Sequence, residues 1–198
     1  MTSLGIVTPM RALLLEPDPA WLEQRHRRGI DRRDEVWDGV LHVVPPPSST
    51  HQGVESELEA VLRPIARAAG WRILHQLGVY DAVQGERNYR VPDLVVFDPR
   101  NLTERGLEGP AEVVVEILSP NDESREKFAF YATCGIAEYW IVDPRSREIE
   151  LYVLRGGAYE RVAPSPDGTL DAPRLALRIH TVEGPKLRIR WIDGSAEI

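Results

Sequence analysis

The stretch AEVVVEILSPNDESREKFAFYATCGIAEYWIVDP, residues 111–144, determines the fold class of this chain. It opens with a short and almost continuous apolar run, which is typical of a strand covered on both faces. A helix is then predicted at about 123–134, because Gly135 stands where a C-terminal cap is preferred. A further strand is predicted at 137–144. This order of strand, helix and strand predicts a sheet with a helix packed on it.

The segments before this stretch add strands. RVPDLVVFDPR, at 90–100, contains a second buried apolar run, and WRILHQLGVY, at 71–80, predicts one more strand. EVWDGVLHVV, at 35–44, predicts a β-hairpin because alternating apolar residues flank Asp38–Gly39, a strong turn signal. The N-terminal half therefore predicts a hairpin followed by strands of the same sheet.

A long helix is predicted at 51–70, because its apolar side chains recur at helical spacing. Ser49 or Thr50 can cap its start. Pro64 is expected to kink this helix, and Gly70 to end it.

Downstream, EIELYVLR at 148–155 and AYERVA at 158–163 continue from the strand at 137–144 as an antiparallel meander. The tail is interrupted by proline and glycine and offers one more strand, LRIRWI, at 187–192. The whole pattern predicts the mixed α/β (α+β) class, a mixed β-sheet flanked by helices with an N-terminal hairpin and a C-terminal meander.

Length and composition exclude several classes of protein. The chain has 198 residues, 42% of them hydrophobic and 28% charged, which fits one folded domain spanning 1–198. No apolar run approaches the length of a membrane span, and Cys134 is the one cysteine, so we expect a cytoplasmic protein without disulfides. The net charge of −7 argues against a DNA coat protein.

Two acidic residues stand in the buried strands. Glu116 interrupts the apolar run at 113–118, and Asp93 follows Pro92 at the start of another run. A carboxylate in a central strand is costly unless it is paired or binds a metal. Two alternatives remain open: Glu116 can pair with an arginine, and Pro92–Asp93 can be a turn.

A lysine follows close behind. Lys127, Phe130, Tyr131 and Cys134 share one stripe of the predicted helix, so Lys127 lies on or beside its packing face. The ammonium either snorkels to solvent or lies beside Asp93 and Glu116. In the second case two carboxylates can hold Mg²⁺ or Mn²⁺, and the lysine can stabilise charge in a transition state of phosphodiester hydrolysis.

The segments VPDLVVF, VVVEILSPNDES and KFAFYATCGIAEYWIVDPRSREIELYVL, with the hairpin EVWDGVLHVVPPPSSTHQ, resemble the Uma-type restriction endonuclease family. The resemblance runs from about Trp21 to Tyr159 and implies a core at about 21–160. It also implies the restriction endonuclease-like fold of the PD-(D/E)XK nuclease superfamily. By that resemblance Asp93 and Glu116 are metal ligands, and the carbonyl of Ile117 is a further one.

This chain departs from the superfamily motif at one position. The motif places lysine two residues after the second acid, and Leu118 stands there. The resemblance therefore implies that Lys127, on the following helix, takes the role of the catalytic lysine together with Asp93 and Glu116.

Weaker candidates surround these three. His51, at the start of the helix at 51–70, can reach the site or cap the helix. In many superfamily members a glutamate of the first helix assists metal binding; Glu55, Glu57 and Glu59 are all available, and the apolar neighbours of Glu57 favour it. Arg87 and Arg90 flank the Asp93 strand and are candidate contacts to nucleic acid.

The functional hypothesis is a Mg²⁺-dependent (or Mn²⁺-dependent) endonuclease that hydrolyses the phosphodiester bonds of DNA. The alternative is a non-catalytic regulatory or protein-binding protein on the same fold, which the negative net charge favours. A homodimer is expected because cutting both strands of a duplex needs two sites, with the meander around 139–153 as the candidate interface.

Overall fold

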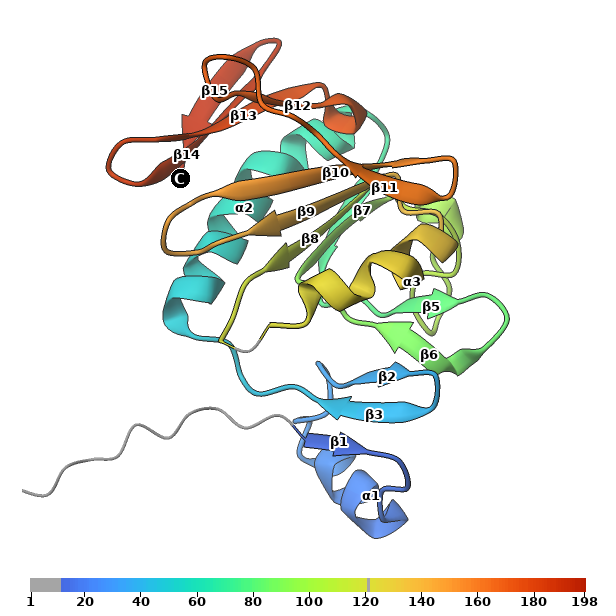
Figure 1. Ribbon diagram of the computed structural model, residues 1–198. Helices are drawn as coiled ribbons and strands as arrows, with labels where there is room; N and C mark the ends of the chain where they lie inside the picture. Colours follow the sequence, from blue (N-terminus) through green and yellow to red (C-terminus); the bar gives the residue numbers. More distant parts are fainter. Residues whose placement is uncertain (1–11, 121) are drawn as a thin grey trace, which may run out of the picture.

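The computed structural model describes residues 12–120 and 122–198. Their strands form three sheets, and Figure 1 shows a six-stranded sheet between an N-terminal five-stranded sheet and a C-terminal four-stranded sheet. The mixed α+β class is therefore confirmed. No helix of the described residues is long and apolar enough to cross a membrane.

The six-stranded central sheet carries the predicted buried strands and the predicted meander. Its one parallel pair is β8 with β9, and the remaining neighbours pair antiparallel. The helix between β8 and β9 supplies the crossover that a parallel pair needs. The strand order is β11 (Ala158–Arg161), β10 (Ile149–Arg155), β9 (Glu138–Val142), β8 (Val113–Ile117), β7 (Leu94–Phe97) and β4 (Arg72–His75).

The predicted hairpin lies in the five-stranded sheet. Asp38 and Gly39 have φ angles of 49° and 89°, the left-handed conformation that a two-residue hairpin turn requires. Helix α1 (Pro19–Arg27) precedes this hairpin. The strand order is β1 (Ala12–Leu14), β3 (Val40–Val43), β2 (Glu35–Trp37), β6 (Gly85–Arg90) and β5 (Val79–Asp81).

The segment at 71–80 forms two strands, β4 and β5, in different sheets, where one strand was predicted. The chain breaks at Gln76, whose φ of 48° is incompatible with a continuous strand. The C-terminal tail also differs from the prediction of one strand at 187–192. It forms a four-stranded sheet of β12 (Leu170–Ala172), β13 (Leu177–Val182), β14 (Lys186–Trp191) and β15 (Gly194–Glu197).

Helix α2 (Ser49–Ala68) matches the predicted long helix and continues through Pro64. Its N-cap is Ser48, one residue before the predicted cap, because the Ser48 side chain accepts a hydrogen bond from the backbone N–H of His51. Gly70, with φ of 82°, follows its end as predicted.

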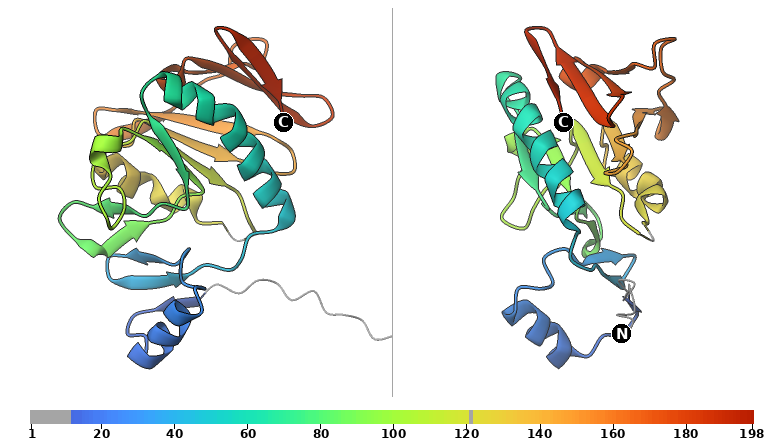
Figure 2. Two further views of the ribbon diagram at one scale, coloured as in Figure 1. Left: turned by 180° about the vertical axis from the view of Figure 1, so that it is seen from behind. Right: turned by 90° about the vertical axis from the view of Figure 1, so that its left-hand side faces the viewer.

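The predicted helix at 123–134 divides into two pieces. Residues Ser124–Lys127 form a short 3₁₀ helix, η2, and Phe128–Thr133 form α3. Two further 3₁₀ turns, η1 (Pro99–Asn101) and η3 (Pro173–Leu175), lie elsewhere. Figure 2 shows α2 and α3 on opposite faces of the central sheet, so both faces are covered.

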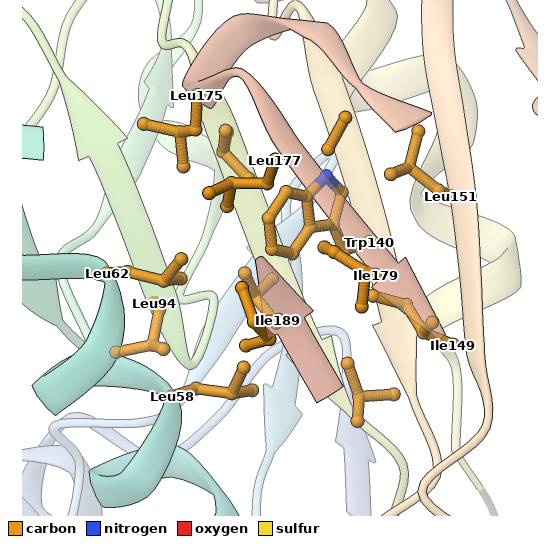
Figure 3. Close-up of a cluster of buried hydrophobic side chains, with 14 of the residues drawn as sticks. Leu58, Leu62, Leu94, Trp140, Ile149, Leu151, Leu175, Leu177, Ile179 and Ile189 are labelled. Atoms are coloured by element: carbon orange, nitrogen blue, oxygen red, sulfur yellow. The ribbon is translucent and has the colours of Figure 1, made fainter. Parts of the chain in front are cut away.

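Each face of the central sheet has its own apolar core. The core on the α2 side contains Trp140, Leu58 and Leu62, and the C-terminal sheet adds Leu177, Ile179 and Ile189 to it (Figure 3). The other core combines α3 with alternate residues of the same strands, including Val114, Phe130, Tyr131, Tyr139 and Ile141. The strands are covered on both faces because successive side chains point in opposite directions.

Strands β9 and β10 each have a hydrogen-bonded neighbour on both sides, and Tyr139 is fully buried. A strand with two partners has no free edge to pair across a two-fold axis. These two strands therefore cannot pair with a second copy through their edges, and the dimer interface around 139–153 stays a prediction.

Candidate active site

Asp93 and Glu116 meet because their strands are antiparallel neighbours. Asp93 comes just before β7 begins, and Glu116 is the second-last residue of β8, so the two lie at the same end of the sheet. The Oδ2 atom of Asp93 accepts a hydrogen bond of 2.8 Å from the backbone N–H of Ile117. Both carboxylates are buried.

Lys127 reaches Glu116 from the helical segment that covers this face of the sheet. Its Nζ atom donates to Oε1 of Glu116 over 2.9 Å, and the hydroxyl of Tyr131 donates to the same oxygen over 2.6 Å. Lys127 is buried, so it does not snorkel into solvent. Of the two alternatives, the structure contains the lysine beside Glu116, with Glu35 and not Asp93 as its second acidic partner among the described residues.

Glu35 is a site residue that sequence analysis missed. Its Oε1 atom accepts from Nζ of Lys127 over 2.8 Å and from the backbone N–H of Val91 over 2.9 Å. Its Oε2 atom accepts from the indole N–H of Trp37 over 2.8 Å. At the start of a hairpin a glutamate looks like an ordinary solvent-facing residue, and no local signal separates it from one.

Helix α2 brings His51 and Glu55 to Asp93. The two are four residues apart and therefore share one face of the helix. The Nε2 atom of His51 lies 3.1 Å from Oδ2 of Asp93, and one potential ligand atom from each of the three buried residues lies within 4.8 Å of the others. Glu57 is on another face, 48% exposed and paired with Arg147, so Glu55 is the inward-facing glutamate.

The arginines separate into different roles. Arg33 donates to Oδ1 of Asp93 over 2.7 Å, which gives the buried carboxylate a cationic partner. Arg90 is buried between the rings of Trp37 and Phe130 and donates to backbone carbonyls, so it cannot contact a phosphate as predicted. Arg87 is exposed on β6.

A small cavity of about 40 Å³ lies where these side chains converge. That volume has room for an ion with a water molecule but not for a nucleotide. Its lining includes Asp93, Glu116, Lys127, His51 and Arg33.

The site concentrates buried negative charge. Burial, aided by the charges of Asp93 and Glu35, raises the pKa of Glu116 to about 7 against the opposing effect of Lys127. Burial opposes ionisation of Asp93, but His51, Arg33 and the Ile117 N–H outweigh it and lower its pKa. Burial likewise opposes the charged form of Lys127, yet Glu116 and Glu35 raise its pKa. The lysine therefore stays protonated.

A divalent cation fits this donor set. Carboxylate oxygens and an imidazole nitrogen are metal ligands, and the Nδ1 atom of His51 is buried without a hydrogen-bond partner among the described residues. A cation would also favour the ionised form of Glu116, whose pKa is raised by burial and by the charges of Asp93 and Glu35. The chemistry of these residues is thus that of a metal site with an adjacent ammonium.

Comparison with known proteins gives the family. The family model Uma2, described as "Putative restriction endonuclease", matches residues 20–183. The chain belongs to the Uma2 family. This match covers the central sheet, the N-terminal sheet except β1, and all of the site residues, so the resemblance predicted from the sequence is confirmed. No curated protein matches the chain.

One solved structure supports the fold of this Uma2 protein. A crystal structure titled as a putative nuclease belonging to DUF820 from Anabaena variabilis has a TM-score of 0.58 and 21% identity, covering 72% of this chain and 83% of that one. It shows the same nuclease-like fold. A cryo-electron microscopy structure of a DrdV–DNA complex has a TM-score of 0.36 and 17% identity, covering 58% of this chain and 10% of that one.

Proposed function

We propose that this Uma2 protein is a metal-dependent endonuclease that hydrolyses phosphodiester bonds of DNA, with Mg²⁺ or Mn²⁺ as its cofactor. The observation that carries the proposal is that Asp93, Glu116 and Lys127 line one buried cavity. Two carboxylates and an ammonium are a combination that phosphodiester hydrolysis uses for charge stabilisation. Membership of the family supports the same activity.

In this proposal a cation would be held by Asp93, Glu55 and His51, together with Glu116 and the carbonyl of Ile117. When bound, the cation supplies a Lewis acid that lowers the pKa of a bound water and neutralises charge on the phosphate. Arg33 and the Ile117 N–H hold the carboxylate of Asp93 in place.

Lys127 acts through its position between two carboxylates. Glu116 and Glu35 each accept one of its hydrogens, which leaves one of the three ammonium hydrogens for a water or a phosphate oxygen. Glu116 and Glu35 keep the lysine charged, so it serves as a hydrogen-bond donor and not as a base. Tyr131 fixes Glu116 from the same helical segment.

The test is cleavage of closed circular DNA, both supercoiled duplex and single-stranded, with Mg²⁺ or Mn²⁺ and with a chelator as the blank. Circular substrates have no ends, so any linear or nicked product reports an endonuclease. We expect cleavage by the wild type and none by Asp93→Asn. Cleavage that persists in Asp93→Asn, or no cleavage with either ion, would refute the proposal.

A non-catalytic regulatory protein on the same fold is the competing function. Calorimetric titration of the wild type with Mn²⁺ distinguishes the two functions. The proposed nuclease must bind a cation at the buried donor set, whereas the non-catalytic protein need not. Stoichiometric binding that Asp93→Asn abolishes supports the nuclease. No binding at millimolar ion supports the alternative.

Contact with DNA through a basic surface is a further part of the proposal. Arg87 is exposed, whereas Arg90 is buried, so Arg87 alone of the predicted pair can neutralise a phosphate. Arg87→Ala should weaken binding and reduce the slope of log affinity against log salt by about one. An unchanged slope would exclude this surface.

We also propose a homodimer, since one site cuts one strand and two copies suit a duplex. Light scattering that returns the monomer mass of 22.3 kDa at micromolar concentration would refute the dimer.

We propose the cytoplasm as the location of the protein. Burial raises the pKa of the half-buried Cys134 thiol to about 12, so this cysteine is an unreactive packing residue that fits a reducing compartment.

A further inference from the structure

A larger groove of about 720 Å³ opens beside the metal cavity. Its walls contain five prolines from three separate loops: Pro45–Pro47 before α2, Pro120 after β8 and Pro144 after β9. Because each proline ring fixes its own backbone φ angle, these walls are stiff. We call this surface the proline groove. Its volume is in the range of sites that enclose a small ligand, roughly 300–1,000 Å³.

The proline groove and the metal cavity are continuous, because Arg33, Val44, His51 and Ser119 line both. One nitrogen atom at this junction, Nη1 of Arg33, is buried without a hydrogen-bond partner among the described residues. Buried donors are almost always satisfied, so this atom indicates a missing ligand. For a guanidinium, a phosphate oxygen is a strong acceptor.

The charge of the proline groove suits a phosphate chain. Arg33 and Arg145 line it, and the one acid, Asp143, already accepts hydrogen bonds from the backbone N–H groups of Arg145 and Ser146. The exposed Arg145 guanidinium forms no ion pair with residues 12–120 or 122–198. Because Arg33 is already paired with Asp93, Arg145 is the arginine of the groove wall whose charge is available to a phosphate.

The depth of the cavity restricts the form of the nucleic acid. Asp93 and Glu116 are only 2% and 5% exposed, at the bottom of a space of about 40 Å³. A phosphate of a paired duplex is held beside its complementary strand, which restricts how far it can enter between the proline walls. An unpaired strand bends freely, and its bases can leave the stack and pack on apolar walls.

We propose that the proline groove binds an unpaired strand of DNA beside the phosphate to be cut, so that this protein acts on single-stranded or locally unpaired DNA. The claim that the bound strand is cut rests on the proposed function. The inference adds the class of substrate. Arg33 contacts the phosphate at the junction, Arg145 contacts its neighbour along the strand, and the prolines contact the sugars and bases.

The first experiment measures binding by fluorescence anisotropy in a chelating buffer, where no cleavage occurs. The probes are a short labelled oligothymidylate and the same strand paired with oligoadenylate. We expect the full-length protein to bind the single strand at least about tenfold more tightly. Equal affinity for the two probes, or tighter binding of the duplex, would overturn the proposal.

The second experiment locates the site with matched variants. Arg145→Ala should weaken single-strand binding about tenfold, as expected for loss of one charged hydrogen bond. Thr50→Glu should weaken it at least as much, and it keeps the fold because a carboxylate is favourable in the first turn of α2. The control is Arg155→Ala. It removes the exposed arginine at the end of β10, which does not line the proline groove.

The outcomes separate this inference from the proposed function. Wild-type binding by both Arg145→Ala and Thr50→Glu would overturn the proline groove even if cleavage is found. Weakened binding in both, with Arg155→Ala unchanged, supports the groove even if no cleavage is found, since the binding assay contains no metal.

Discussion

The Nζ atom of Lys127 lies 2.8 Å from Oε1 of Glu35, a residue 92 positions earlier in the chain. The same nitrogen donates to Glu116 over 2.9 Å. Because Glu35 belongs to the five-stranded sheet and Glu116 to the central sheet, one ammonium joins the two sheets at the site. All three side chains are buried, so solvent screens their interactions only weakly.

Glu35→Ala should therefore destabilise the protein by about 3–5 kcal/mol, because it leaves a buried ammonium with one carboxylate and removes an acceptor from Val91 and Trp37. The free energy of unfolding is measured in urea. Glu57→Ala is the control, since its half-exposed pair with Arg147 contributes at most about 1 kcal/mol. If the two variants unfold at the same urea concentration, the link to Lys127 does not stabilise the fold.

Lys127→Arg tests whether the compact shape of the lysine ammonium is needed for cleavage. The planar guanidinium cannot occupy the space of an ammonium held between Glu35 and Glu116, although the charge is kept. We expect the rate of DNA cleavage to fall by about 10²–10³ while the metal affinity stays close to that of the wild type. The control is Lys186→Arg, which makes the same change at the exposed second lysine, on β14. Wild-type cleavage by Lys127→Arg would mean that the ammonium has no catalytic role.

His51 should set the choice of metal. Mg²⁺ prefers oxygen ligands, whereas Mn²⁺ accepts an imidazole more readily, so we expect tighter calorimetric binding of Mn²⁺. His51→Ala should reduce the affinity for Mn²⁺ about tenfold or more and bring the two ions closer together. His180→Ala, on β13, is the matched control. An unchanged ratio of the two affinities in His51→Ala would remove His51 from the ligand set.

Glu116 makes the stability of the metal-free protein depend on pH. Its pKa rises from 4.5 to about 7 on folding, so between these values the folded state binds the proton more tightly than the unfolded state does. Stability is therefore lost as the pH rises through this window. Glu116→Gln cannot lose a proton, so its stability relative to the wild type should increase from about pH 5 to about pH 8, by at most about 3 kcal/mol.

Urea unfolding of both proteins across this range, in a chelating buffer, measures the difference and cancels the titration of all other groups. Glu57→Gln serves as the control on a partly exposed carboxylate. A difference between Glu116→Gln and the wild type that does not change with pH would show that Glu116 titrates near its ordinary value.

The sequence by itself determined the elements whose signals are local. Asp38 and Gly39 specify a hairpin because both adopt positive φ angles, and Gly70 marks the end of α2 for the same reason. The apolar runs around Glu116 and Asp93 specified buried strands, and the stripe containing Lys127 and Tyr131 specified which face of the helical segment packs on the sheet. Periodicity is a property of neighbouring residues, so a single chain is enough to read it.

Only the tertiary structure decided which partners surround this site. Glu35 reaches Lys127 across 92 positions, and Arg90 is buried on two aromatic rings instead of facing a phosphate. The choice of Glu55 over Glu57 depends on where α2 lies against the strands. The physical reason is that local periodicity does not encode contacts between distant segments: a buried charge is stable only beside a partner, and the packing of sheets and helices determines which partner it meets.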